Sequence, residues 1–412
     1  MSVLLISTYD VGRQPFGLAS PAAWLKRAGC EVTCVDLSRE KLDAAVIASA
    51  QLAAFYLPMH TATRLAMPVI GRLRAINSSI AIAAYGLYAP LNETLLREHG
   101  VSVVLGPEAE EDLVAWATGH PEGLPRHSLP RLAFIRPDRG GLPALDRYAS
   151  LQMPDGSRKV VGATEATRGC KHRCRHCPIV PVYDGQFRVV PVDVVLADVR
   201  AQVAQGAAHI TFGDPDFFNG PTHARKLTEA LHAEFPTLTY DAIIKVEHLL
   251  QHRDLLPLLV RTGCLFVTSA VESVDDEVLA KLEKGHTRAD FIAAATLCRD
   301  AGLTLVPTFV AFTPWTTLDG YRDLQEVVEA LGLTSHVSPI QWGIRLLVTW
   351  QSRLLELDDI RNVVGPFDQK TLTFPWRHPD PRVDALQQQM MALASVPRPR
   401  TEVPYLDEPW YC

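Results

Sequence analysis

The alternation of short apolar runs with helical patterns is the feature that most constrains the fold of this chain. In the first part of the chain, the runs typical of buried strands are 2–7, 31–38, 52–58, 79–86 and 101–106. Strands that alternate with helices in this way form a parallel sheet with helices on both faces. We therefore expect residues 1–120 to form a doubly wound, flavodoxin-like α/β domain.

A second alternating series begins after a Pro-rich bridge at 121–150, which lacks a sustained apolar period and is predicted to be a linker. The strands expected beyond the bridge lie near 160–166, 208–213, 238–245, 265–271, 304–311 and 336–346. Six successive strand–helix units predict a partial (β/α)6 barrel over 151–346, with its chemistry at the carboxyl ends of the strands. Residues 347–412 then form a C-terminal extension.

Composition narrows the classes of partner. The net charge of −6 and the sequence pI of about 6.2 lack the basic excess of a nucleic-acid-binding protein. No window approaches the ~20 apolar residues of a membrane span, and the N-terminal segment lacks the basic region of a signal peptide. We expect a cytoplasmic protein that acts on a small molecule, with neither nucleic acid nor membrane as partner.

Three cysteines and two histidines fall within the stretch RGCKHRCRHCP (168–178), just past the first expected barrel strand. A structural zinc site uses four ligands, usually as two separated pairs, and this stretch has no second pair of cysteines. A [4Fe–4S] cluster held by three thiolates instead leaves one iron open for a cofactor or substrate. The residues favour the cluster. A zinc site within a non-catalytic binding module stays open as the alternative of another class.

The spacing C-x3-C-x2-C after the first strand of a parallel barrel, flanked by TRGC and CP, resembles the radical SAM superfamily. The resemblance implies that Cys170, Cys174 and Cys177 bind the [4Fe–4S] cluster. It also implies that S-adenosylmethionine (SAM) is chelated by the open iron. An external electron donor, such as a flavodoxin or ferredoxin, would reduce the cluster.

The ends of two further strands match motifs that contact SAM in this superfamily. In HITFGDPDFFN (209–219) the resemblance implies that Gly213, Asp214 and Asp216 meet the methionine moiety, although an ordinary Asp-Pro turn is the alternative. The segment SAVESVDDEVLAKLEKGHT (269–287) resembles one whose Glu-Ser pair contacts SAM. The matching positions are Glu272 and Ser273.

Two cations are expected at the same end of the barrel. Lys245 follows the third strand and Arg345 lies on the sixth, so both are expected to point into the mouth of the barrel. A cation there would neutralise a ligand carboxylate. Ion pairing outside the site is the alternative for each.

The N-terminal domain resembles the cobalamin-binding-like domain that precedes many radical SAM cores. The Asp-x-His-x-x-Gly signature that supplies a histidine ligand is absent, because the first loop is YDVGRQPFG (9–17). Cobalamin therefore stays an open alternative that nothing in the sequence requires.

Segments at both ends resemble the radical SAM proteins with a CUAEP or CCAEP tail, which include the arsinothricin-pathway enzyme. These segments are LLISTYDVGRQPFGLASPAAWL, AAYGLYAP, FVAFTPWTT and PYLDEPWYC. The resemblance implies transfer of the 3-amino-3-carboxypropyl group of SAM to thiol-bound As(III), with arsenite as substrate and Cys412 as a catalytic thiol. The pattern departs after Cys412, where a codon read as stop and a true loss are both open explanations.

Which C–S bond of SAM breaks is not fixed by any motif. The alternatives within the superfamily are a 5′-deoxyadenosyl-radical enzyme and a cobalamin-dependent methyltransferase, each acting on another small molecule.

Overall fold

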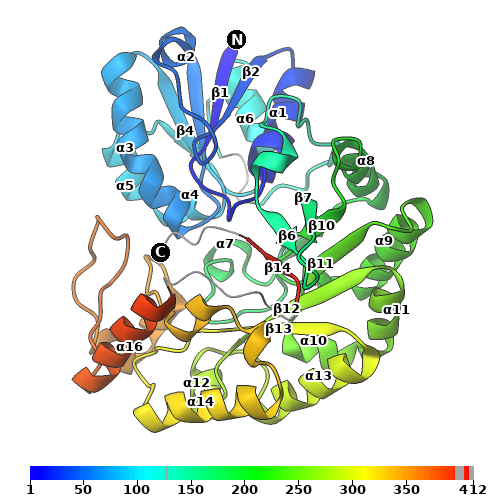
Figure 1. Ribbon diagram of the computed structural model, residues 1–412. Coiled ribbons are helices and arrows are strands. Elements are labelled where there is room, and N and C mark those ends of the chain that lie inside the picture. Colours follow the sequence, from blue (N-terminus) through cyan, green and yellow to red (C-terminus); the bar gives the residue numbers. More distant parts are fainter. Residues whose placement is uncertain (126–128, 395–402, 408–412) are drawn as a thin grey trace.

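The computed structural model describes residues 1–125, 129–394 and 403–407. These residues form two α/β units. In Figure 1 the N-terminal unit, in blue and cyan, lies above the second unit, which runs from green to red. The carboxyl ends of the N-terminal strands face the second unit.

The N-terminal unit is built on a five-stranded sheet in the order β2-β1-β3-β4-β5, with every pair of neighbours parallel. Its strands are β1 (Ser2–Ser7), β2 (Glu31–Asp36), β3 (Leu52–Tyr56), β4 (Ala81–Tyr85) and β5 (Val103–Val104). This is the flavodoxin-like strand order. The predicted fold class of this part of the chain is confirmed.

Helices cover both faces of this sheet. They are α1 (Phe16–Arg27), α2 (Ala44–Ser49), α3 (His60–Ile76), α4 (Tyr88–Leu91), α5 (Glu93–Glu98) and α6 (Glu110–Ala117). Along β1, Leu4 and Ile6 enter the core beneath α3, whereas Val3 and Leu5 enter the core beneath α1 and α6. Because successive side chains of a strand point to opposite faces, a strand covered on both sides is apolar throughout.

The second unit is a half-barrel with a sheet in the order β13-β12-β11-β10-β7-β6-β14. The strands are β6 (Ser150–Gln152), β7 (Arg158–Thr164), β10 (His209–Phe212), β11 (Thr239–Ile243), β12 (Cys264–Glu272), β13 (Thr304–Phe309) and β14 (Tyr405–Leu406). In this sheet, strands β7, β10, β11, β12 and β13 are parallel, and β6 and β14 are antiparallel to their neighbours. A separate hairpin joins β8 (Thr167–Gly169) to β9 (Phe187–Val189).

Most helices of this unit pack on the outside of the half-barrel or lie in the C-terminal extension, whereas α7 (Val180–Tyr183) lies between the two units. The other helices of this unit are α8 (Val192–Val203), α9 (Pro221–Glu234), α10 (Val246–Gln251), α11 (Leu256–Arg261), α12 (Asp276–Lys281), α13 (Arg288–Ala301), α14 (Leu318–Ala330), α15 (Asp358–Arg361) and α16 (Pro381–Ala394). The core between helices and sheet includes Phe212, Tyr240 and Phe291, all fully buried.

The sixth barrel strand, expected at 336–346, is not formed. Two short 3-10 helices, Thr334–His336 and Pro339–Trp342, occupy that position, and a single bridge joins Phe312 to Arg345. Proline has no N–H for a ladder and its φ suits a helical turn. The N–H of Phe309, which would pair with a sixth strand, instead donates to the side chain of Gln341 at 2.9 Å.

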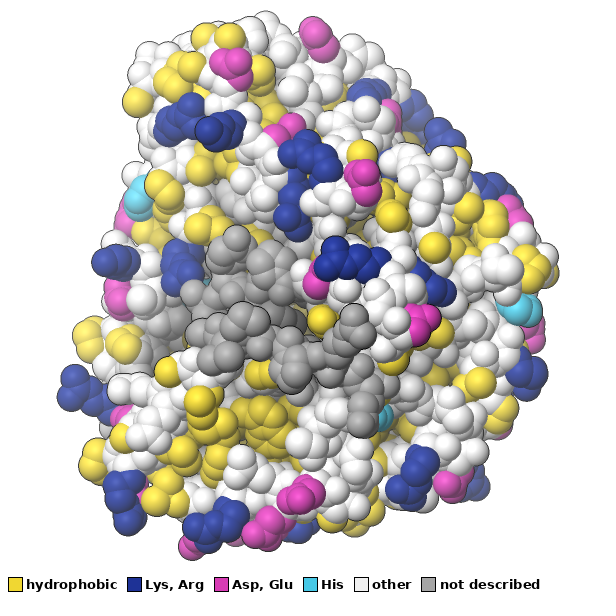
Figure 2. All heavy atoms as spheres, viewed as in Figure 1, with side chains coloured by type: hydrophobic (Ala, Val, Ile, Leu, Met, Phe, Trp, Pro, Cys, Tyr) yellow, Lys and Arg dark blue, Asp and Glu magenta, His cyan; other side chains and the backbone are white. Residues whose placement is uncertain are grey.

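The surface and the helix lengths bear on possible partners. No helix among residues 1–125, 129–394 and 403–407 is long and apolar enough to cross a bilayer. On the face seen in Figure 2, basic and acidic side chains are interspersed among the described residues. This face therefore has no concentrated field of one sign.

Candidate functional site

The three cysteines of the C-x3-C-x2-C stretch lie in the loop after β8, at the mouth of the half-barrel. The turn into the loop requires Gly169, whose φ is 77° and where an added Cβ would meet the Tyr183 ring at 2.4 Å. Asn219 holds the first part of the loop: its Oδ1 accepts the Lys171 N–H at 3.2 Å and lies 3.8 Å from the Cys170 Sγ. Asn219 is the last residue of the motif HITFGDPDFFN, but it was not among the residues predicted from the sequence.

The cysteine thiols are spaced too widely to share one metal ion. Among the described residues, one group of three ligating atoms lies within 4.8 Å of one another, and it consists of His172, Asp216 and His248 rather than cysteines. Zinc–sulfur bonds of about 2.3 Å would bring tetrahedral sulfurs within about 4 Å of one another. An iron–sulfur cluster binds its thiolates to separate irons. The spacing therefore favours a cluster over zinc at these cysteines.

Burial affects the charge of the same thiols. Cys170 and Cys174 are buried and Cys177 is partly buried. Burial raises the pKa of Cys177 to about 12 and also raises the pKa of Cys170. Binding to a metal deprotonates such thiols outright. Without a metal these two thiols therefore stay protonated at neutral pH, and a cationic centre would have to displace their protons.

Glu272, at the end of β12, contacts the cysteine loop. Its Oε1 lies 3.2 Å from the His176 Nε2 and 3.4 Å from the Lys284 Nζ. Burial opposes ionisation, but Lys284 and His176 lower the pKa of Glu272 to about 2. Glu272 has a φ of 71°, which is strained for a residue other than glycine. A charged side chain in a strained backbone conformation is typical of a functional position. Lys284 was not among the residues predicted from the sequence, although it lies within the segment SAVESVDDEVLAKLEKGHT (269–287).

The residues after β10 divide between two roles. The two carboxylate oxygens of Asp214 accept hydrogen bonds from Thr167 Oγ1 at 2.5 Å and from the Ala166 N–H at 3.0 Å. Burial raises the pKa of Asp214 to about 7. Asp214 therefore joins β10 to the start of the cysteine loop. Asp216 instead faces His172 and His248, and Gly213 lines a pocket beside the loop.

Of the two predicted cations, Lys245 lies close to the cysteine loop. It is 7% exposed, and its Nζ lies 3.5 Å from the Glu247 Oε2. Burial raises the pKa of Cys170, and the positive charge of Lys245 acts in the opposite direction. Lys245 is therefore placed where a cation would serve a bound carboxylate.

The expectation that Arg345 points into the mouth is wrong. Its guanidinium donates to Asp384 at 2.6 Å and lies 3.4 Å from the centre of the Trp376 ring. These partners belong to the C-terminal extension, and no sequence pattern indicates that this extension lies next to Arg345.

Ser273 lies in the turn after β12, where its Oγ accepts the Asp275 N–H at 3.1 Å. Cys412 lies outside the described residues.

A pocket of about 180 Å³ lies between the N-terminal sheet and the cysteine loop. Tyr56 and Tyr85 line it from the carboxyl ends of β3 and β4, and Arg168 and Gly213 line it from the half-barrel. In open α/β sheets, ligands bind at the carboxyl ends of the strands. The pocket therefore joins the ligand-binding edges of both units.

One guanidinium and several carboxylates form the floor of this pocket. Arg168 contacts Glu110 at 2.7 Å, Glu165 at 2.8 Å and Glu108 at 3.1 Å. Burial raises the pKa of Glu108 and of Glu165. The second oxygen of Glu110, Oε2, is buried and accepts no hydrogen bond. The pocket therefore has acceptors to spare and suits a ligand that brings hydrogen-bond donors or positive charge.

Residues 164–328 match the model of the radical SAM superfamily. This part of the chain resembles a radical SAM domain. Such a domain uses a [4Fe–4S] cluster and SAM, in agreement with the cofactors expected from the cysteines. The match begins at the last residue of β7 and ends within α14, so it contains the cysteine loop and the ends of β10, β11 and β12.

Curated relatives match this chain at low identity. The tRNA-2-methylthio-N(6)-dimethylallyladenosine synthase of Methylococcus capsulatus is 26% identical over 48% of this chain and 45% of its own length. The hopanoid C-3 methylase of the same organism is 24% identical over 39% of this chain and 30% of its own. The bacteriochlorophyllide d C-12(1)-methyltransferase of Chlorobaculum tepidum is 28% identical over 30% and 27%. The chain thus spans less than half the length of these relatives.

Two solved structures extend the likeness of fold to the N-terminal unit. The radical SAM methyltransferase TsrM from Kitasatospora setae, with tryptophan and a SAM analogue bound, matches with a TM-score of 0.65 at 17% identity. That match covers 94% of this chain and 88% of TsrM. The cobalamin-dependent radical SAM enzyme OxsB, with aqua-cobalamin bound, gives 0.68 at 14% identity, over 94% and 66%. The arrangement of both units is therefore shared with enzymes of known structure.

Proposed function

We propose that the protein is a radical SAM transferase whose [4Fe–4S] cluster is bound by Cys170, Cys174 and Cys177. The observation that carries this proposal is the position of three widely spaced, largely buried thiols at the mouth of a radical SAM domain. When bound, the cluster supplies the electron that cleaves the sulfonium of SAM. The protein contributes binding, orientation and exclusion of water.

The residues proposed to hold SAM lie at the ends of neighbouring strands. Glu272 is anionic and buried, which suits the amino group of the methionine moiety, and Lys245 suits its carboxylate. Gly213 lies on the neighbouring loop after β10, whereas Asp216 on the same loop faces His172 and His248 instead. Asp214 is left out of the proposed contacts because both of its oxygens are already occupied.

The proposed acceptor site is the pocket between the two units. It lies beside the cysteine loop, since Arg168 and Gly169 line it and Cys170 follows them. The curated relatives include a hopanoid methylase and bacteriochlorophyllide methyltransferases, which modify small molecules. Transfer of a methyl group, or of another group derived from SAM, to a small molecule with hydrogen-bond donors is the activity that these observations support best.

Cobalamin is the second cofactor that the likeness of fold brings into question, and the pocket does not fit a corrin ring. Its volume of about 180 Å³ lies below the ~300–1,000 Å³ of pockets for drug-sized ligands, so it suits only an acceptor group much smaller than a corrin ring. The Tyr56 ring also lies against Gly17, where an added Cβ would meet it at 2.2 Å. We therefore assign no step to cobalamin. Titration of the protein with hydroxocobalamin, followed by its absorption spectrum, tests this directly.

The proposal is tested by anaerobic reconstitution with iron and sulfide, followed by incubation with SAM and dithionite. Cys170→Ala, Cys174→Ala and Cys177→Ala are each expected to lose the cluster and SAM cleavage, since each removes one of three protein anchors. Cys298→Ala is the matched control, because Cys298 is buried in the core of α13. Full iron content with intact turnover in any of the first three would overturn the ligand assignment.

The nucleoside product distinguishes the types of transfer. S-Adenosylhomocysteine indicates methyl transfer, and 5′-deoxyadenosine indicates cleavage toward the adenosyl side. Transfer of the aminocarboxypropyl group to thiol-bound As(III) would leave 5′-methylthioadenosine instead. None of the relatives named above acts, by its name, on an arsenic compound, so this activity stays a prediction of the tail resemblance. Addition of arsenite to wild type and Cys412→Ser, with analysis of the nucleosides, tests it.

A further inference from the structure

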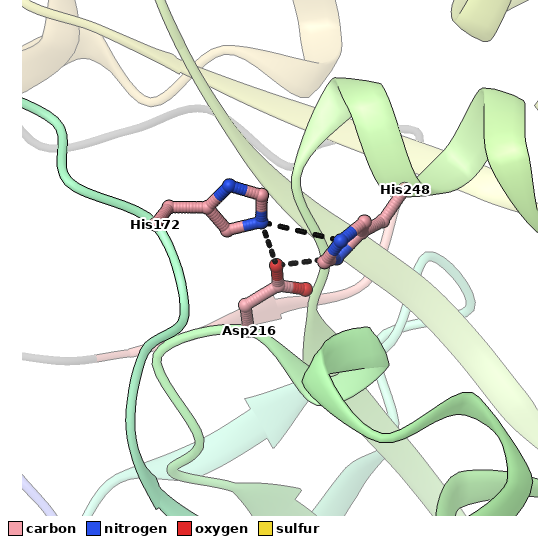
Figure 3. A group of neighbouring side chains, drawn as sticks. All are labelled: His172, Asp216 and His248. Atoms are coloured by element: carbon pink, nitrogen blue, oxygen red, sulfur yellow. Dashed lines mark hydrogen bonds and ion pairs between the residues drawn. The ribbon is translucent and has the colours of Figure 1, made fainter. Parts of the chain in front are cut away.

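A second group of metal-ligating side chains lies next to the cysteine loop, and the cluster does not use it. Figure 3 shows His172, Asp216 and His248 converging from three separate elements. His172 belongs to the loop between Cys170 and Cys174, Asp216 follows β10, and His248 lies in α10. Their ligating atoms lie within 4.8 Å of one another.

The contacts within this group are close but are not a complete hydrogen-bond network. The Asp216 Oδ2 lies 2.6 Å from the His248 Nδ1, and both side chains are fully buried. Neither of these two atoms makes a hydrogen bond with acceptable geometry. The three side chains are thus held in close contact without satisfying one another's hydrogen-bonding geometry.

The distances from the His172 Nε2 to the other two side chains match those between ligands of a single metal ion, with His248 binding through Nε2 while its Nδ1 stays against the Asp216 carboxylate. The Nε2 atoms of His172 and His248 lie 3.2 Å apart, and the His172 Nε2 lies 3.5 Å from the Asp216 Oδ2. Metal–nitrogen bonds of about 2.0–2.1 Å in a tetrahedral site place two ligand atoms roughly 3.3 Å apart. A cation between these atoms would bind all three side chains with little movement.

The surroundings supply outer contacts of the kind that orient metal ligands. The other ring nitrogen of His172, Nδ1, lies 3.6 Å from the Glu247 Oε2. The second oxygen of Asp216, Oδ1, accepts the Phe218 N–H at 3.2 Å. Histidines that bind metals usually direct their second nitrogen to a carboxylate or carbonyl. Lys245 lies 3.5 Å from Glu247 and offsets one negative charge.

We propose that His172, Asp216 and His248 bind one divalent transition-metal ion of the zinc and ferrous class, separate from the iron–sulfur cluster. Imidazole and carboxylate ligands suit these ions, and three protein ligands leave a coordination position open. His172 is the one ligand of the three with an exposed side chain, at 15%. The open position therefore lies on the side of the cysteine loop, where it would take an oxygen or nitrogen atom of a bound molecule.

Zinc is the probe for the test. The anaerobically reconstituted full chain is equilibrated with Zn²⁺, desalted and analysed for zinc and iron. About one zinc per chain is expected in addition to the cluster iron, and X-ray absorption at the zinc edge is expected to show nitrogen and oxygen ligands alone. This readout is independent of SAM turnover. It can therefore succeed or fail separately from the proposed function.

Variants of the group provide the decisive comparison. His172→Ala and His248→Ala are each expected to reduce retained zinc at least about tenfold, because each removes a ligand. His252→Ala is the control, since its ring centre lies 5.7 Å from that of His248 but outside the group. If His248→Ala does not fold, the amount of zinc retained by His172→Ala, whose substitution lies on the loop, decides the test. Sulfur ligands to zinc, or equal zinc retention in wild type and His172→Ala, would overturn the proposal.

Discussion

Arg139 and Asp198 form a doubly hydrogen-bonded ion pair, with Nε to Oδ1 at 2.7 Å and Nη2 to Oδ2 at 2.8 Å. Both side chains are 1% exposed. The same guanidinium donates to the Gln14 Oε1 at 2.8 Å and to the Ala163 carbonyl at 2.6 Å. Arg139 thus joins the bridge segment, the first loop of the N-terminal unit and the half-barrel. Arg139 therefore holds the N-terminal unit and the half-barrel together beside the pocket that lies between them.

Arg139→Met is expected to lower the free energy of unfolding by about 3–5 kcal/mol, because it leaves the buried Asp198 without its partner. Denaturant unfolding measures the change. Lys26→Met is the matched control. Lys26 pairs with the neighbouring Asp138 at 2.9 Å, but both side chains are about one-third exposed. An exposed pair contributes about 1 kcal/mol or less. Equal losses in the two variants would contradict the role given to Arg139.

Glu272→Gln is expected to weaken SAM binding by about tenfold or more while iron content is unchanged, because the substitution removes a charge-assisted hydrogen bond. Titration of the anaerobic holoprotein measures the dissociation constant. Glu234→Gln is a suitable control, since Glu234 pairs with Arg200 at 2.7 Å on the surface, and neither residue lies in the cysteine loop. Unchanged affinity in Glu272→Gln would make Glu272 a purely structural residue.

Arg345→Leu is expected to leave SAM affinity within about twofold of wild type, because the guanidinium contacts Asp384 and Trp376 and not the mouth. Its cost should appear instead as a loss of stability of about 1–2 kcal/mol, from the lost ion pair and cation–π contact. The two effects are separated by SAM titration and thermal unfolding. A large loss of affinity at unchanged stability would restore the original expectation for Arg345.

Cys34 is expected to resist alkylation at pH 8 in the folded protein, because burial raises its pKa to about 12 and leaves little thiolate. A cysteine thiol exposed to water ionises near 9.0. The protonated thiol therefore contributes stability that is fully present below pH 9 and is lost as the pH rises towards 12. Mass spectrometry after iodoacetamide treatment tests the first point, with denatured protein as the reference. Rapid native modification at pH 8 would contradict it.

Much of the fold was predictable because local sequence patterns determine it. Val3, Leu5 and their neighbours form continuous apolar runs, and parallel strands covered on both faces require such runs. The sixth strand was predicted wrongly because its apolar pattern matches a strand, whereas Pro339 and the side chain of Gln341 replace the ladder. This replacement depends on the hydrogen bond from the Phe309 N–H to Gln341, two residues that are 32 positions apart in the chain, so a local pattern does not indicate it.

The candidate site was predictable only where residues follow strand ends. Cys170 and Glu272 each follow a β-strand pattern, so their place at the mouth could be inferred from sequence. His248 lies in a short helix that looks like an ordinary surface segment, and only the fold brings it to Asp216. Arg139 stands in a segment without periodicity, which gives no sign that its side chain is buried. The histidines between the cysteines were the available signal for a second metal site.

The pairing of β14 with β6 has a consequence for how the protein is made. Asp407 accepts the Ser150 N–H, and the two residues are 257 positions apart in the chain. During synthesis, β6 therefore emerges from the ribosome long before the strand that covers its outer edge. Until then it is a bare sheet edge of the kind that pairs with other polypeptides. Prematurely terminated products that lack residues 403–407 would keep this edge permanently, which makes them prone to aggregate.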